Sequence, residues 1–165
     1  MSELTNAVVE LEEDTQKDKF LTFALEDEFY GIDIKYVTEI IGIQSITKVP
    51  ELPDYIKGII NLRGKIIPVI DVRLRFSKNS KNYNDRTCII VVEIKNTLIG
   101  LIVDTVSEVL SIAEQNIVPP PDFKANFNSK YIKGIGKVDN EVKLLLDCEK
   151  LLADYNLNSV ASVLN

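Results

Sequence analysis

Few side chains in this sequence could carry out acid–base, nucleophilic or metal chemistry. The 165-residue chain contains no histidine, so it has no imidazole to transfer protons near neutral pH or to bind a metal. Its two cysteines, Cys88 and Cys148, lie far apart in apolar stretches outside any CxxC motif, which predicts two reduced core thiols. Gly134-Ile-Gly136 lacks the third glycine of a phosphate-binding loop. The sequence therefore predicts no cofactor and no metal site.

The carboxylates are the remaining candidates for catalysis. Two of them can share acid and base roles, as in glycoside hydrolysis, and the candidates are Asp33, Asp71, Asp104 and Asp147. Asp71 and Asp147 occupy equivalent positions in an internal repeat, so structural duty at a strand end is the stronger interpretation. A small carboxylate enzyme stays open as an alternative, and it requires that Asp71 and Asp147 share a cleft.

Charge and hydropathy restrict the partners. The chain carries 25 acidic against 19 basic residues, a net charge of −6, which opposes a nucleic-acid-binding barrel and a polybasic membrane anchor. No apolar run approaches the ~20 residues that cross a bilayer. The first residues lack the basic start and apolar stretch of a secretory signal. We therefore expect a cytoplasmic protein.

Short strands dominate the first half of the chain. Aromatic and β-branched residues alternate in brief segments separated by polar turns. A two-residue turn, Arg63-Gly64, joins the last two of them, and glycine supports the positive φ that such turns require. The predicted strands are 20–25, 29–34, 37–47, 56–62 and 65–71. The polar stretch Ser77–Asp85 is predicted to be a loop.

The pattern then repeats. Tyr55-Ile-Lys-Gly58 recurs as Tyr131-Ile-Lys-Gly134, an offset of 76 residues that continues to Asp71 and Asp147. Upstream the offset is 69 residues, and it matches Gly31, Val37 and Glu39 with Gly100, Val106 and Glu108. The second copy thus carries seven extra residues between Pro119 and Tyr131, which we expect to form a surface loop. These matches indicate a tandem duplication.

The duplication predicts an all-β fold of two five-stranded, SH3-like or OB-like barrels related by a pseudo-twofold axis. The copies span about 19–75 and 87–150. Each copy alone is too short to bury enough surface, so the two should share an apolar contact; strand exchange between them stays open. Residues 1–17 are predicted to be an acidic tail and 156–165 a C-terminal tail. A short helix is expected from Cys148, with Leu151, Leu152 and Tyr155 on one side.

Residues found in only one copy are the better functional candidates. Glu39 and Glu108 are shared and therefore favour a structural role, as do Gly58 and Gly134. The hairpin tip Asn61-Leu-Arg-Gly-Lys65 of the first copy becomes Lys137-Val-Asp-Asn-Glu141 in the second. Arg63 would project a planar fork of donors from this tip, which is typical of an interface anchor; an ordinary solvated turn arginine is the alternative.

The stretch from Val49 to Arg73 closely resembles the CheW family, the coupling proteins of bacterial chemotaxis. The resemblance is strongest at Asn61-Leu-Arg-Gly64 and the Ile-Pro-Val-Ile-Asp71 that follows, and Val37-Thr-Glu-Ile40 resembles the segment before it. It covers nearly everything but the tails, and the domain it defines is 18–155. A chain of 165 residues leaves no room for kinase domains, and no receiver domain is appended, so we expect the free-standing coupler.

The resemblance implies two SH3-like barrels with an apolar groove between them and no catalysis. It implies an adaptor that links the helical hairpin tip of a chemoreceptor (a methyl-accepting chemotaxis protein) to the histidine kinase CheA, whose regulatory domain has the same fold. Such a protein works in the cytoplasm, at receptor arrays on the inner face of the membrane. Another protein-binding barrel module is the alternative.

The resemblance also assigns a receptor-binding site by motif position. Arg63 and Gly64 would form the receptor-contacting tip, with Leu62 and Ile66 as the apolar wall beside it. Val37 and Glu39 would lie near the same groove. No motif assigns the kinase-contacting residues.

Overall fold

The computed structural model describes residues 16–120 and 129–153. Most of the predicted acidic tail, the seven-residue insertion, Tyr155 and the C-terminal tail lie outside these residues. The described chain is mainly β, with a few short helical segments. The predicted all-β fold class is confirmed.

The strands match the sequence prediction closely, except that the third ends early, at Gly42. Thr47, at the end of that predicted segment, makes only an isolated bridge to Ile59. The strands are β1 Lys19–Leu25, β2 Glu28–Asp33, β3 Val37–Gly42, β4 Ile56–Leu62, β5 Lys65–Asp71, β6 Cys88–Ile94, β7 Thr97–Val103, β8 Thr105–Ser111, β9 Ile117–Val118, β10 Ile132–Val138 and β11 Glu141–Leu146. The helices are α2 Val72–Arg75 and α3 Cys148–Leu152, and the 3-10 turns are η1 Ile34–Tyr36, η2 Glu114–Asn116 and η3 Ser129–Tyr131.

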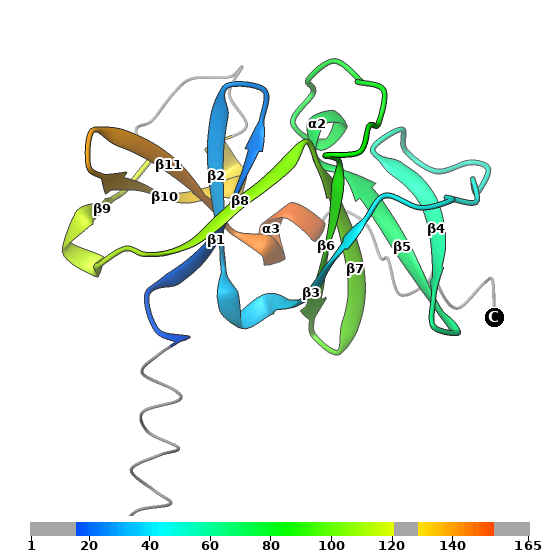
Figure 1. The fold of residues 1–165 in the computed structure, drawn as a ribbon, viewed down its shortest axis with the longest axis horizontal. Helices are drawn as coiled ribbons and strands as arrows, with labels where there is room; N and C mark the ends of the chain where they lie inside the picture. The colour runs from blue at the N-terminus through cyan, green and yellow to red at the C-terminus, as the bar shows by residue number, and fades with distance from the viewer. Residues whose placement is uncertain (1–15, 121–128, 154–165) are drawn as a thin grey trace, which may run out of the picture.

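The strands form two sheets, and each curves into one of the two lobes in Figure 1. The first barrel is the six-stranded sheet β8-β1-β2-β11-β10-β9, and the second barrel is the five-stranded sheet β3-β6-β7-β5-β4. The two orders correspond strand by strand under the sequence repeat. Even the parallel contacts agree, because Leu145 pairs with Gly31 in one barrel and Val69 with Gly100 in the other. The barrels are therefore related by the predicted pseudo-twofold symmetry.

The sheets do not coincide with the sequence copies 19–75 and 87–150. The β1–β2 hairpin of the first copy lies in the first barrel, beside β8 and β11 of the second copy. The second barrel consists of residues between 37 and 103, while the first combines the N-terminal hairpin with residues after 104. The strand exchange that the sequence left open thus joins the copies, and neither copy forms a barrel alone.

Gly58 and Gly134 each sit at a bend, as the repeat predicts. The pairing register shifts between Ile56 and Gly58 in the second barrel, and at the equivalent point before Gly134 in the first. Gly58 has a φ of 145°, and an added Cβ would lie 2.1 Å from the carbonyl oxygen of Thr47. Both a bulge and a close backbone approach therefore require glycine there.

Three hydrophobic clusters hold the fold together. The smaller two fill the barrels: one includes Ile67 and Val91 of the second barrel, the other Ile112 and Leu145 of the first. The largest, here called the seam cluster, joins the barrels and draws on strands of both together with α2 and α3. The seam is therefore a packed core. It is the apolar contact between the two copies that the duplication predicts.

An aromatic ladder runs through the seam cluster. Successive ring centroids from Phe23 through Tyr30 and Phe76 to Tyr131 lie 5.5, 5.4 and 5.7 Å apart. The guanidinium of Arg75 lies between the equivalent Tyr55 and Tyr131, 4.4 and 4.6 Å from their ring centroids. Stacked and cation–π contacts of this kind fix the relative position of packed elements.

Candidate docking groove

The hairpin tip between β4 and β5 is a tight turn with both central residues in the left-handed region. Arg63 has a φ of 51° and Gly64 a φ of 89°, the backbone that matches the twist of a two-residue hairpin. The backbone N–H of Gly64 donates to Oδ1 of Asn61 at 2.8 Å. Gly64 therefore has the positive φ that the sequence predicted. Asn61 also fixes the turn from which the exposed Arg63 side chain projects.

Arg63 reaches across to the edge strand β3. Its Nη2 donates to Oε1 of Glu39 at 2.5 Å, and the side chains are 70% and 30% exposed, respectively. Exposed ion pairs of this kind contribute only about 0–1 kcal/mol to stability. The pair therefore positions the guanidinium of Arg63. A binding partner could displace Glu39 from it at little cost in free energy.

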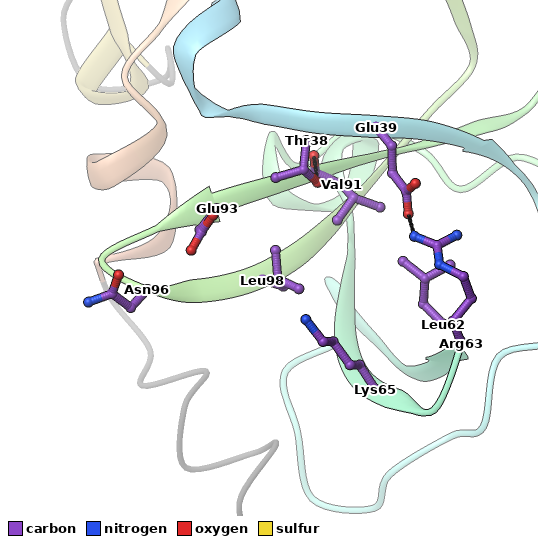
Figure 2. Close-up of a pocket in the computed structure, with 9 residues that line it drawn as sticks. All are labelled: Thr38, Glu39, Leu62, Arg63, Lys65, Val91, Glu93, Asn96 and Leu98. Atoms are coloured by element: carbon purple, nitrogen blue, oxygen red, sulfur yellow. Dashed lines mark hydrogen bonds and ion pairs between the residues drawn. The ribbon is translucent and has the colours of Figure 1, made fainter.

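A groove of about 570 Å³ opens beside this ion pair at the mouth of the second barrel. Figure 2 shows its arrangement: β3 runs beside β6 of the β6–β7 hairpin, and the β4–β5 tip lies across from them, where Arg63 meets Glu39. Leu62, Val91 and Leu98 belong to or pack against the apolar interior of the second barrel and give the groove an apolar floor. Charged and polar side chains form its rim: Thr38, Glu39, Arg63, Lys65, Glu93 and Asn96.

The structure brings only part of the predicted site together. Leu62, Arg63 and Glu39 line the groove, with Gly64 in the turn beside them. Ile66 and Val37 instead pack against the seam cluster. The pairing explains the separation: Leu62 pairs with Lys65, so these two share a face, and Ile66 lies on the opposite one. The groove also lies within the second barrel and not between the barrels.

The sequence reasoning missed the contributions of β6, β7 and the turn between them. Val91, Glu93, Asn96 and Leu98 line the groove although they lie about thirty residues beyond the hairpin tip. The repeat shows that the β6–β7 hairpin corresponds to the β1–β2 hairpin. No local sequence pattern predicts that β6–β7 lines the same groove as the β4–β5 tip. Lys65, which alone would be a solvated tip charge, also lines the groove.

The candidate catalytic carboxylates have structural partners. Asp71 caps α2, since its Oδ1 accepts from the backbone N–H groups of Arg73 and Leu74, and its Oδ2 accepts from the Tyr83 hydroxyl at 2.7 Å. Asp147 caps α3 in the equivalent position. The interpretation of this pair as strand-end structural residues is confirmed.

The other two carboxylates are paired as well: Asp104 binds Arg73, and Asp33 binds Lys133. Across residues 16–120 and 129–153, no group of three or more cysteine, aspartate or glutamate side chains could hold a metal ion. The same part of the chain has no helix of the length and hydropathy that membrane crossing requires.

The two cysteine thiols, both predicted to lie in the core, differ in burial. Cys148 is buried at the start of α3, and burial raises the pKa of its thiol to about 12. Cys88 is only partly buried at the start of β6, where its thiol donates to the carbonyl oxygen of Arg86.

Comparison with known proteins gives a consistent result. The family model described as a CheW-like domain matches residues 19–156. Chemotaxis protein CheW of Klebsiella aerogenes is 38% identical over 94% of both chains, and CheW of Helicobacter pylori is 33% identical over 81% of both. The solved scaffolding protein TtCheW from Thermoanaerobacter tengcongensis is 44% identical, with a TM-score of 0.74 over 79% of this chain and 88% of its own.

Proposed function

The chain belongs to the CheW family of chemotaxis scaffold proteins, and from that premise we propose that it couples the cytoplasmic tip of a chemoreceptor to the histidine kinase CheA. Family membership itself makes the chain a chemotaxis adaptor and not an enzyme. The specific partners and the surface that meets each of them are the proposal.

The groove at the mouth of the second barrel is the observation that carries the receptor half of this proposal. Its apolar floor of Leu62, Val91 and Leu98 suits the apolar side chains at the tip of a helical hairpin. Arg63, at its rim, offers a fork that can bind a receptor carboxylate or the free carbonyl groups at a helix end. In this pairing the receptor group takes the place of Glu39, the half-buried partner of Arg63.

The kinase half rests on the shared fold that the family resemblance implies. A regulatory domain built from the same barrels can pair with this chain barrel to barrel, leaving the groove open to the receptor. We place the adaptor in the cytoplasm, at receptor arrays on the inner face of the membrane. The kinase-contacting residues are unassigned.

The test is the affinity of a receptor hairpin-tip fragment for Arg63→Ala and Arg63→Glu variants, measured by calorimetry. We expect a loss of about 1–3 kcal/mol, or roughly 5- to 150-fold in Kd, with Arg63→Glu the weaker binder. Thermal stability should hold, because Arg63 is exposed.

Asp139→Ala is the matched control. Asp139 takes the position of Arg63 at the β10–β11 tip of the first barrel and also has a left-handed backbone, with a φ of 54°. This variant should bind the fragment like wild type. Equal affinity of wild type and both Arg63 variants would remove Arg63 from the interface. Failure of the unmodified protein to bind receptor fragment or kinase regulatory domain would overturn the proposal as a whole.

A further inference from the structure

The mouths of the two barrels are equivalent by symmetry but differ in what fills them. In the second barrel, Ile60 and Ile67 pair across β4 and β5 and leave the groove open above them. In the first barrel, the residues at these positions are Gly136 and Lys143, which pair across β10 and β11. A long charged side chain and a glycine have thus replaced two isoleucines on the inward face.

Lys143 is buried inside the first barrel. It is 4% exposed, which is rare for a lysine without a partner. Its cross-strand neighbour Gly136 faces the barrel interior, where an added Cβ would lie 3.0 Å from Ile112 and 3.6 Å from Leu145. Because facing residues of a strand pair point to the same side, the Lys143 stem enters this interior as well.

The charged end of Lys143 is held at the mouth. Its Nζ lies 4.2 Å from the centroid of the Phe29 ring and 2.9 Å from Oε2 of Glu141. Phe29 corresponds to Leu98 and Glu141 to Lys65, both of which line the open groove of the second barrel. The ammonium, the ring and the carboxylate therefore occupy the space that is groove in the other barrel.

The rim of the first barrel is also unsuited to the partner that Arg63 would bind. The Arg63–Glu39 ion pair is replaced by Asp139 and Glu108, two acids. The backbone of Glu108 is tied to the buried hydroxyl of Thr22, which donates to its carbonyl at 2.7 Å and accepts from its N–H at 3.1 Å. The position that corresponds to Arg63 therefore holds an acid, Asp139, at this mouth.

We propose that Lys143 is a specificity-determining plug: it closes the first barrel, so that the adaptor takes up a receptor hairpin at the second barrel only. The closure of the first barrel by Lys143 does not depend on which partner the chain binds. The statement that one receptor hairpin binds per adaptor rests on the proposed function.

Amine acylation of the folded full-length chain, read by mass spectrometry, tests the closure. Lys143 should react at least about tenfold more slowly than Lys65, since its amine reacts only when the mouth opens. Glu141→Gln and Phe29→Ala should each speed the labelling of Lys143 without changing that of Lys65. In urea-unfolded protein the two lysines should react alike. Folded protein in which Lys143 labels as fast as Lys65 would show that no plug exists.

Calorimetric stoichiometry with a receptor hairpin-tip fragment tests the one-sidedness. Wild type should bind one hairpin per chain. Arg63→Glu should weaken binding at that one site and reveal no second one. Two sites in wild type, or a site that survives Arg63→Glu and is lost in Asp139→Ala, would overturn the inference. A complete lack of receptor binding would refute the proposed function and leave the labelling result to decide the plug.

Discussion

Gly58 is the residue at which one added methyl group should do the most damage. Its φ of 145° is unfavourable for any side chain, and the new Cβ would meet backbone atoms of Thr47, which cannot rotate away as a side chain can. We expect Gly58→Ala to lower the free energy of unfolding by about 3 kcal/mol, at the upper end for a single substitution. Urea denaturation measures the change.

Gly42→Ala is the matched control, because Gly42 ends β3 in open space with nothing within 4 Å of the added carbon. This variant should unfold within about 0.5 kcal/mol of wild type. If both variants unfolded at the same urea concentration, the Thr47 contact would not be the reason for glycine at position 58.

Single residues were predictable where the reason is local. The Arg63-Gly64 turn and its projecting arginine follow from the two residues themselves, and the structure has them as predicted. The faces of Val37 and Ile66 were not predictable from motif position, since a shift of one residue in a strand moves a side chain to the opposite face. Lys143 was missed because only its three-dimensional neighbours distinguish a buried lysine from a solvated one.

The two short helices should respond unequally to loss of their caps. Asp71 accepts two backbone N–H groups and the Tyr83 hydroxyl, whereas among the described residues Asp147 accepts one backbone N–H group, that of Lys150. Asp71→Ala should therefore destabilise the protein by about 2 kcal/mol and Asp147→Ala by about 1 kcal/mol, the usual range for an N-cap. Thermal and urea unfolding of the two variants measure both values.

Tyr83→Phe separates the cap from the hydroxyl contact. It removes only the hydrogen bond to Oδ2 of Asp71. Its loss of stability should therefore equal part of the difference between the two alanine variants. Equal losses for Asp71→Ala and Asp147→Ala would mean that the additional partners of Asp71 contribute nothing.

At the scale of elements, the sequence predicted the strands better than their partners. Alternation and turn residues located β1, β2, β4 and β5 almost to the residue. The repeat predicted which strands are equivalent. Neither states whether the β1–β2 hairpin closes its own copy or the other. Both arrangements use equivalent strand pairs and differ only in which connections pass between the barrels, here those through η1 and Asp104.

The barrels are joined by charge as well as by the seam cluster. Arg73 of α2, with a side chain only 4% exposed, donates Nε and Nη2 to the two oxygens of Asp104 at 2.6 Å each. It also donates Nη1 to Glu26, in the turn of the β1–β2 hairpin, at 2.9 Å. Asp104 stands where the chain passes from β7 to β8, and its Oδ2 also accepts the backbone N–H of Glu26. One arginine thus connects the second barrel to the hairpin of the first.

This connection should give stability a dependence on acid. Burial alone would raise the pKa of Asp104, but the hydrogen bonds from Arg73 and from the Glu26 backbone outweigh it and lower that pKa below its ordinary value. A carboxyl group with a lowered pKa in the folded protein contributes stability above its unfolded pKa near ~4, and that contribution disappears as pH falls through the folded value. At neutral pH, Asp104→Asn should therefore cost about 3 kcal/mol, because it leaves Arg73 poorly paired.

The gap between wild type and Asp104→Asn should narrow between pH 5 and pH 2, as wild-type Asp104 takes up a proton and loses its charge. Urea unfolding at several pH values measures this difference in the free energy of unfolding. The same comparison is then made in an Arg73→Met background. In that background, Asp104→Asn should change stability little at neutral pH, since the partner of the charge is gone. If the stability difference between wild type and Asp104→Asn stayed constant with pH, the charge of Asp104 would not matter. The barrels would then be joined by the seam cluster alone.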